Sequence, residues 1–251
     1  MIQRSSGGAG PPAPIENATA KLAPPGLAAA VVSTGGAAEI VTSGLADVRT
    51  LRPVSAQLIA SCAGQPFCEF VRSELLEPLG MSRTGFEHAR APADVATGYW
   101  RLPPGGRAAL RPMLPPGIVG QRTRDLVSFR PFYVNGPPYG GLVGDVHDAA
   151  RFLALHLGCG AAFGQRLLSA ESAIAMRTLT TKGRRLTTGL GWWRRHESGD
   201  AGGLVEHLGG GGAYRNLMRL YPARGQAVVM FGNLTRYPVE ALAGTVSSRA
   251  N

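Results

Sequence analysis

Residues 206–216 read EHLGGGGAYRN, and the pattern that they begin continues to Thr235. Apolar and β-branched residues are separated here by turn residues, which predicts strands over 204–208, 213–221 and 226–233, joined by a glycine turn and then a charged turn. Glycine beside a strand indicates a place where another backbone can come close. This stretch therefore predicts an antiparallel ladder of strands. The glycines beside one of these strands allow another backbone to come close to it.

The rest of the chain adds helices and further strands to this ladder. Upstream, Asp145 can cap a helix over 146–157, and a second helix over 170–178 and a strand over 186–195 follow it. Other predicted elements are a hairpin of strands 27–33 and 37–45, an exit loop over 47–53, two short helices between 57 and 79 that Gly64 separates and Pro78-Leu79-Gly80-Met81 ends, and a closing helix over 239–247. Strands at both ends with helices between them predict an α+β fold, in which one antiparallel sheet is built from both termini and flanked by helices.

Two segments carry little periodicity. Residues 1–14 are rich in Ser, Gly and Pro and predict a flexible leader, which a short helix over 15–22 follows. Residues 82–139 are dominated by Pro, Gly and Arg, so we expect a long irregular segment there. A chain of 251 residues can bury the core of one large domain. We therefore expect a single domain over 15–251 after the leader.

The chain is strongly basic, with a formal net charge of +10. Its arginines are dispersed, singly or in pairs such as Arg184-Arg185 and Arg194-Arg195, and no aromatic residues are interleaved with them. Nucleic acids and anionic membranes bind clustered cations. We therefore predict neither nucleic acid nor a membrane as a partner.

The N-terminus and the cysteines indicate the compartment. Residues 1–14 contain no apolar signal segment, and the chain has no run of about eighteen apolar residues. Cys62, Cys68 and Cys159 form neither an even disulfide set nor a metal pattern. We expect three buried thiols in a reducing, cytoplasmic compartment.

Four of the histidines show no ligand spacing. His88, His147, His156 and His196 are expected on exposed turns or helix faces. Their separation along the chain does not match the short intervals of zinc sites. The sequence predicts no metal and no cofactor.

Motifs along nearly the whole chain resemble those of the serine β-lactamase-related family, which contains class C β-lactamases, D-alanyl-D-alanine carboxypeptidases and related esterases. Each motif is short, and their shared order carries the resemblance. They are Pro25-Gly26, GLAD at 44–47, AGQPF at 63–67, LEPLGMSRT at 76–84, Gly98-Tyr99, YGGL at 139–142 followed by Asp148 and Phe152, GLGW at 189–192, HLG at 207–209 and Asn233. The resemblance implies a β-lactamase/transpeptidase-like fold and an acyl-enzyme hydrolase that acts on a small-molecule acyl substrate.

The nucleophile that this chemistry needs is missing from the sequence. In the family a helix carries Ser-x-x-Lys, because residues three apart share a helix face and the lysine can take the serine proton. This chain has only Lys21 and Lys182, and the residues three positions before them are Ala18 and Leu179. At 54–58, where the family places that helix and a Tyr-x-Asn element, the chain passes directly into the next helix. We therefore expect an internal deletion near 54–58 that removes most of the helical subdomain.

Two sets of residues imitate parts of the missing machinery. Tyr133-Val134-Asn135 spells Tyr-x-Asn, but it follows the LEPLGM motif and so stands on the wrong side of the family order. Ser61, Ser5 and Ser6 have no general base in a supporting motif and no Gly-x-Ser-x-Gly elbow. We interpret the first as coincidence and assign the serines no catalytic role.

The resemblance assigns the remaining site residues to the strand over 204–208 and its glycines. In the family this edge strand carries Lys-Thr-Gly or His-x-Gly, whose side chain faces the substrate carboxylate or the serine, and the next backbone N–H forms half of the oxyanion hole. Carried over, His207 is the polar group, Gly209 the family glycine and Gly210 the backbone donor. The alternative is that His207 is a hydrogen-bonded strand histidine and the glycines form a bulge or turn.

Three functions compete on this sequence. The first is an acyl-enzyme hydrolase that recruits a substitute serine. The second is a non-catalytic binding or regulatory module on the same scaffold, which would self-associate through the sheet surface that the deletion exposes. The third is binding of nucleic acid or anionic lipid through the arginines, which predicts steep salt dependence. Because losing the nucleophile removes orders of magnitude in rate, we predict a β-lactamase-related hydrolase scaffold that is catalytically impaired.

Overall fold

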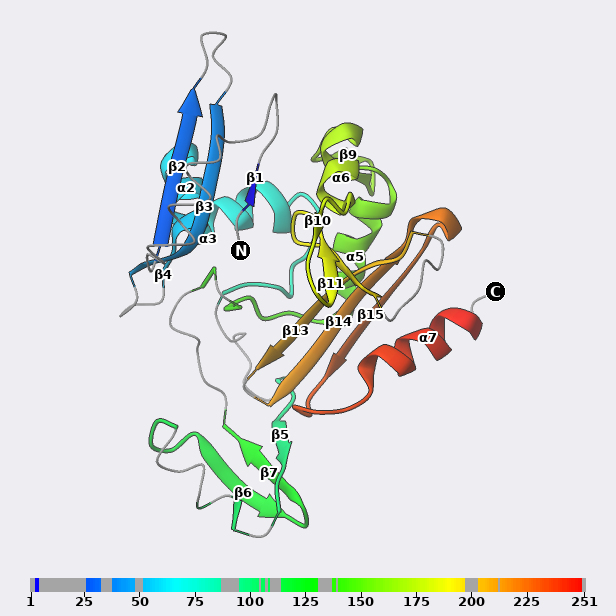
Figure 1. Cartoon of the computed structure of the whole chain (residues 1–251). Helices are drawn as coiled ribbons and strands as arrows, with labels where there is room; N and C mark the ends of the chain where they lie inside the picture. Colours follow the sequence, from blue (N-terminus) through cyan, green and yellow to red (C-terminus); the bar gives the residue numbers. More distant parts are fainter. Residues whose placement is uncertain are drawn as a thin grey trace. The chain divides into compact units, whose positions relative to one another are not determined.

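The computed structural model describes residues 3–4, 26–32, 38–47, 52–86, 95–103, 105–106, 108, 114–130, 137–138, 140–196, 203–211 and 213–249 (Figure 1). Within these ranges, side chains are described between Ala56 and Gly244. The chain divides into two compact units, one of Met1–Ser73 with Val134–Leu142 and one of Glu74–Tyr133 with Val143–Asn251. Most of the leader, the helix predicted over 15–22 and Tyr133-Val134-Asn135 lie outside the described residues. The single domain over 15–251 stays a prediction.

The first unit contains a small antiparallel sheet. Its strands are β1 (Gln3–Arg4), β2 (Gly26–Val32), β3 (Ala38–Asp47) and β4 (Arg52–Pro53), in the order β1-β3-β2 with β4 also paired to β3. Gly26 lies opposite Gly44 and Val32 opposite Ala38, which confirms the predicted hairpin. The predicted exit loop over 47–53 ends in β4, a strand too short to give a periodic signal.

Three helical segments follow β4. They are α2 (Val54–Ala63), α3 (Phe67–Val71) and the π-helical turn η1 (Arg72–Leu76). The break predicted at Gly64 is confirmed, because Gly64 has a φ of +66°, which glycine adopts without steric cost. The amide N–H of Met81 donates to the carbonyl of Leu76 at 2.8 Å and closes the last turn where the sequence predicts its end.

The second unit is built around a six-stranded antiparallel sheet. Its strands, in spatial and chain order, are β10 (Thr181–Lys182), β11 (Leu186–Thr188), β12 (Trp193–Arg195), β13 (Val205–Gly211), β14 (Tyr214–Tyr221) and β15 (Gln226–Gly232). The single strand predicted over 186–195 is wrong in one respect. It is two strands, because Gly191 turns the chain with a φ of +81°.

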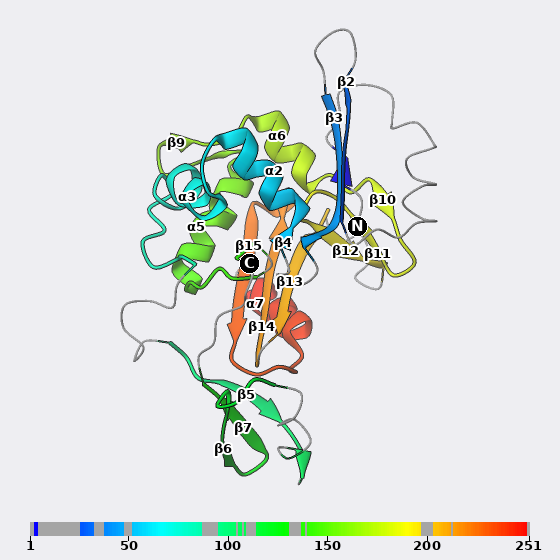
Figure 2. The same ribbon diagram turned by 90° about the vertical axis from the view of Figure 1, so that its left-hand side faces the viewer.

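Helices cover both faces of this sheet (Figure 2). These helices are α5 (Val146–Leu157), α6 (Ala170–Arg177) and α7 (Val239–Arg249). The unit also contains the short 3-10 turn η5 (Pro222–Arg224) and the hairpin of β8 (Ala161–Ala162) and β9 (Gln165–Arg166). The predicted cap of α5 is confirmed, because the Asp145 carboxylate accepts a hydrogen bond from the Asp148 amide at 3.0 Å. Ser169 caps α6 in the same way.

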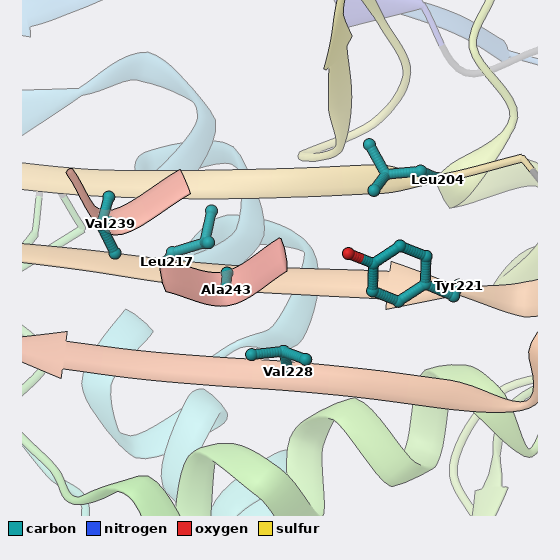
Figure 3. Packing of buried hydrophobic residues seen from close by; sticks show 6 residues of the cluster. All are labelled: Leu204, Leu217, Tyr221, Val228, Val239 and Ala243. Atoms are coloured by element: carbon teal, nitrogen blue, oxygen red, sulfur yellow. The ribbon is translucent and has the colours of Figure 1, made fainter. Parts of the chain in front are cut away.

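Alternation along β14 divides the core into two layers. Leu217 and Tyr221 pack with Val239 and Ala243 of α7, as Figure 3 shows. Leu220, one position out of phase, packs instead with Leu153 of α5 and with Trp192. Successive strand residues point to opposite faces, so a single strand supplies both cores.

The segment over 82–139 is not irregular throughout, which corrects the prediction. It holds a three-stranded antiparallel sheet of β5 (Gly98–Arg101), β6 (Val119–Thr123) and β7 (Leu126–Phe129), in the order β5-β7-β6. Val127 and Phe129 are buried with Ala213. These strands are four or five residues long, and such short runs between Pro and Gly residues give almost no periodicity to detect.

The strand pairing separates the two ends of the chain. Within the described residues, β1 to β4 pair only with one another, and β10 to β15 do the same. The predicted α+β class is confirmed. By their strand pairing, the described strands from the two ends of the chain form two separate sheets rather than the one that was expected. None of the helices in the described part of the chain has the length and apolar character that a membrane crossing requires.

Candidate functional site

The predicted site residues lie on one strand, β13. In its ladder with β14, Gly209 is opposite Asn216 and Gly210 is opposite Arg215. His207 and Gly210 are both exposed. A Cβ added at Gly210 would meet no described atom within 4 Å. The strand is therefore open at Gly210 to the close approach of another molecule.

The glycine run is strand rather than turn. β13 continues through Gly211, although the sequence predicts its end at Leu208. The chain reverses only after Gly211, where Ala213 has a left-handed φ of +79°. The turn predicted for Gly209 and Gly210 is wrong. Glycine is compatible with both a turn and an extended strand, so the glycine run does not distinguish the two.

His207 is exposed yet held in place. Its Nδ1 lies 2.6 Å from the carbonyl oxygen of Gly191, in the turn between β11 and β12. Its ring lies against the Trp193 indole, with ring centroids 4.3 Å apart and planes inclined by 41°. The hydrogen bond and the ring contact together restrict the orientation of the imidazole.

Sequence reasoning missed both partners of His207. The sequence indicated no contact of His207 with Gly191 or with either tryptophan. Trp192 is buried in the core, with 3% of its surface exposed. Trp193 meets His207 because the chain turns at Gly191 and returns beside β13. Nothing local in the sequence specifies that turn, although a tryptophan next to a glycine turn is a reason to examine its cross-strand neighbours.

A buried charged network lies under the site strand. Glu206 and Arg219 face each other across β13 and β14, and Arg219 Nη2 donates to Glu206 Oε2 at 2.6 Å. Arg215 Nη2 donates to Glu240 Oε1 on α7 at 2.7 Å. Burial by itself lowers the pKa of Arg219, but the hydrogen bonds to Glu206 and Tyr221 outweigh it and raise the pKa. Burial likewise opposes ionisation of Glu240, yet hydrogen bonds from its own backbone and from Arg215 lower its pKa.

The loop end of this hairpin contacts β5. A Cβ on Gly98 would lie 2.8 Å from the Cβ of Ala213 and 2.9 Å from the Tyr214 ring, so glycine is required for the packing. The Tyr214 hydroxyl donates to the Ala96 carbonyl at 2.5 Å. Burial raises the pKa of that phenol, which keeps the donor proton in place.

Two of the motifs that are distant in sequence meet here. The Tyr99 amide donates to the Asn233 carbonyl at 2.8 Å. The Asn233 side chain in turn donates to the Thr97 carbonyl at 2.8 Å. The Gly98-Tyr99 motif and Asn233 therefore join β5 to the end of β15.

Another pair of motifs meets at the start of α5. The buried Asp148 carboxylate accepts the Arg83 amide and the Thr84 hydroxyl, each at 2.8 Å. Arg83 Nε also pairs with Asp145 at 2.7 Å. The pKa of Asp145 is lowered, first by the hydrogen bond from the Asp148 amide and then by the Arg83 charge. The end of LEPLGMSRT is thus anchored to the helix that follows YGGL.

Several serines that could replace a nucleophile serve the fold instead. The Ser128 hydroxyl accepts the Gln121 amide at 2.9 Å and donates to the Gln121 carbonyl across β6 and β7. The Ser169 hydroxyl caps α6 and donates to Ser172 Oγ at 2.9 Å. None of these contacts supplies a base.

His156 is buried, which corrects its prediction as an exposed histidine. It has 1% of its surface exposed, and its ring lies edge-on to Phe152 and Trp192 at centroid distances of 4.8 and 5.0 Å. Neither ring nitrogen has a hydrogen-bond partner among the described residues. Burial, aided by the charge of Arg177, lowers the pKa of His156 to about 4.

The cysteines are free but not buried. Cys62 is exposed, and Cys68 and Cys159 are half-buried, so the expected buried thiols are wrong. Burial raises the pKa of the Cys68 thiol, with a smaller effect of Glu69 in the same direction. Over the ranges that the structure describes, no three His, Cys, Asp or Glu side chains are grouped to hold a metal.

A family model described as Beta-lactamase matches residues 54–247. A search of the curated proteins found no match. Among solved structures, an octameric penicillin-binding protein homologue from Pyrococcus abyssi is 22% identical, with a TM-score of 0.55, and covers 75% of this chain and 38% of its own.

Two other solved structures give the same picture. A beta-lactamase from Sulfitobacter sp. EE-36 is 15% identical, covers 76% of this chain and 54% of its own, and has a TM-score of 0.55. A D-alanine carboxypeptidase from Burkholderia cenocepacia is 18% identical, covers 74% of this chain and 55% of its own, and also has a TM-score of 0.55. The chain thus spans little more than half the length of these relatives, or less. These likenesses confirm the predicted fold class.

Proposed function

This chain belongs to the beta-lactamase family, and on that premise we propose that it is a serine hydrolase scaffold that does not form an acyl-enzyme. Strand β13 faces the ligand. His207 is its polar side chain, Gly209 is the position where the ligand comes close to the backbone, and Gly210 donates a backbone N–H. The observation that carries the proposal is in the sequence. Neither of its two lysines stands three residues after a serine.

The physical reason is the activation of the hydroxyl. A serine is a weak nucleophile unless a neighbouring base takes its proton as it attacks the carbonyl. Hydrogen-bond donors and a binding surface that remain without the nucleophile leave roughly 10³–10⁴-fold catalysis over water in a model enzyme, far below the intact rate. We assign His207 no role as that base, because its hydrogen bond among the described residues is to the Gly191 carbonyl and not to a serine. The Ser128 and Ser169 hydroxyls bond to other groups of the fold.

We place the missing segment near 54–58. α2 begins at Val54 directly after β4, and the family match begins at the same residue. A deletion at this junction accounts for the lack of Ser-x-x-Lys and of most of the helical subdomain. The limited coverage of the solved relatives supports it.

The test is covalent labelling followed by intact-mass spectrometry. We expect no mass increase after incubation with a fluorophosphonate, and none with a chromogenic cephalosporin. An active class C β-lactamase treated in parallel shows that the reagents acylate. A stoichiometric adduct on a single serine of this chain would sink the proposal.

A second candidate function is a binding or regulatory module on the same scaffold. The observation that favours it is the fixed orientation of an exposed side chain: His207 is held by Gly191 and Trp193 although no core packing requires it. An ordered polar group beside bare glycines suits ligand binding without turnover. Chemical-shift changes at His207, Gly209 and Gly210 on adding a small amide or ester would support it.

We also propose that the chain self-associates. β15 is the terminal strand of the six-stranded sheet among the described residues, and its Phe231 is 37% exposed. Exposed strand edges and apolar side chains favour pairing with another copy. Sedimentation across a tenfold or greater range of concentration tests this, and a monomer with a sharp, cooperative melting transition throughout would contradict it.

A further inference from the structure

The orientation of His207 determines which of its nitrogens carries a proton. Nδ1 lies 2.6 Å from the Gly191 carbonyl oxygen, which can only accept a hydrogen bond. Nδ1 must therefore be the donor. A neutral imidazole carries one proton, so the same contact leaves Nε2 with its lone pair.

Nε2 is the nitrogen available to a ligand. His207 is exposed, and the part of the chain that the structure describes contributes no hydrogen bond at Nε2. A flip of the ring about its Cβ–Cγ bond would put Cδ2 in the place of Nδ1 and lose the hydrogen bond to Gly191, so this hydrogen bond favours the observed orientation. The adjoining Gly209 and Gly210 carry no side chain, so a ligand can lie along the strand beside this lone pair.

We propose that the neutral His207 acts as a hydrogen-bond acceptor, and that the β13 edge selects ligands that present a donor, such as a carboxamide N–H, over ligands that present a carboxylate. The proposal rests on the proposed ligand-facing role of β13. A carboxamide N–H can donate a hydrogen bond to Nε2. An ionised carboxylate has only acceptor oxygens, whose lone pairs would repel the lone pair of Nε2. His207 is thus a specificity-determining residue whose selectivity originates in the backbone carbonyl of Gly191.

The first experiment reads the tautomer without a ligand. The full chain, labelled with ¹⁵N, is examined by long-range proton–nitrogen correlation at about pH 8, where ordinary imidazoles are neutral. We expect the His207 nitrogens to show the Nδ1–H form, with Nε2 in the range of an unprotonated nitrogen. The Nε2–H form as the major species would overturn the proposal.

The second experiment compares two matched probes, N-acetylglycine amide and N-acetylglycine. We expect the amide to shift the Nε2 signal and the Gly209 and Gly210 amides, and to bind up to about tenfold more tightly than the acid, the difference that one hydrogen bond can make. Equal or tighter binding of the acid would overturn the acceptor role while leaving the site in place. Binding of neither probe would overturn the acceptor role and the ligand-facing role of β13 together.

Variants separate this inference from a general change of charge. His207→Lys replaces the acceptor with a donor cation, so we expect the preference to reverse toward the acid. His196→Lys adds the same charge at another exposed histidine of the sheet, whose Nε2 contacts Thr187, and should leave the preference unchanged. A reversal in both variants, or in neither, would contradict the proposal.

Discussion

Glu206 and Arg219 lie directly opposite each other in the β13–β14 ladder, and both side chains are buried beneath the site strand. Arg219 donates from Nε and Nη2 to the same Glu206 oxygen, at 3.0 and 2.6 Å. Glu206 has no exposed surface and Arg219 has 6%. The pair therefore holds Glu206, the neighbour of His207 on β13, on the buried face of the sheet.

Arg219→Ala should strongly destabilise the protein. It removes both hydrogen bonds of the buried Glu206 carboxylate and leaves Arg195 Nε, 4.0 Å away, as its remaining cation. Losing the partner of a buried charge in this way costs about 3–5 kcal/mol of unfolding free energy. Urea unfolding followed by two spectroscopic probes measures it. Arg101→Ala is the matched control, because Arg101 pairs with Asp125 at 2.8 Å while both are more than half exposed, and such pairs contribute at most about 1 kcal/mol. Equal losses in the two variants would contradict the prediction.

Gly98→Ala should lower stability through overpacking. The new methyl group would lie 2.8 Å from the Ala213 Cβ and 2.9 Å from the Tyr214 ring, so the hairpin end must shift at a cost of about 1–3 kcal/mol. Gly210→Ala is the control, since its methyl group would enter open space. Thermal unfolding of the two variants side by side decides the matter, and an unchanged melting temperature for Gly98→Ala would refute the packing argument.

Asp148→Ala should loosen the end of the LEPLGMSRT motif. The buried carboxylate accepts both the Arg83 amide and the Thr84 hydroxyl, and removing it leaves two donors without a partner, each at about 1–3 kcal/mol. Hydrogen exchange at the Arg83 amide is the sensitive measurement and should become markedly faster. Thr84→Val, which removes only the hydroxyl, should leave that amide protected. Protection that persists in Asp148→Ala would show that another group holds the segment.

Elements with a local signal could be predicted from the sequence. The helix α5 shows apolar residues at helical spacing after the cap Asp145, and the β2–β3 hairpin consists of two apolar and β-branched runs that are close in sequence. β5 gave no such signal, because its position depends on bonds such as that between Tyr99 and Asn233, which are far apart in sequence. Pairings of that kind are set by the tertiary structure rather than by periodicity.

The candidate site divides in the same way. His207, Gly209 and Gly210 could be predicted because a short motif fixes their order on one strand. Gly191 and Trp193 could not, since they reach His207 only through the turn after β11. The burial of His156 could have been recognised, because it stands four positions after Phe152 and three after Leu153 and so shares the apolar face of α5.

The buried His156 should make the protein acid-sensitive. Its folded pKa is lowered to about 4 from the ordinary 6.5, mainly by burial and then by Arg177. Below about pH 6.5 the unfolded chain binds a proton that the folded chain does not, so stability falls as the pH falls from 6.5 toward 4 and is constant above that window. The difference between the two pKa values corresponds to at most about 3 kcal/mol. Unfolding free energies measured by urea titration at about pH 7, 6 and 5 should therefore decline.

A variant assigns that decline to His156. His156→Leu keeps an apolar group between Phe152 and Trp192 and removes the titrating ring, so its decline toward acid pH should be smaller than that of the unaltered protein by up to the same amount. His147→Gln, at an exposed position on the same helix, should keep the full decline. If His156→Leu and the unaltered protein lose stability in parallel between about pH 7 and 5, the acid sensitivity originates in other groups, because removing the only proton-binding difference at this site would then have changed nothing.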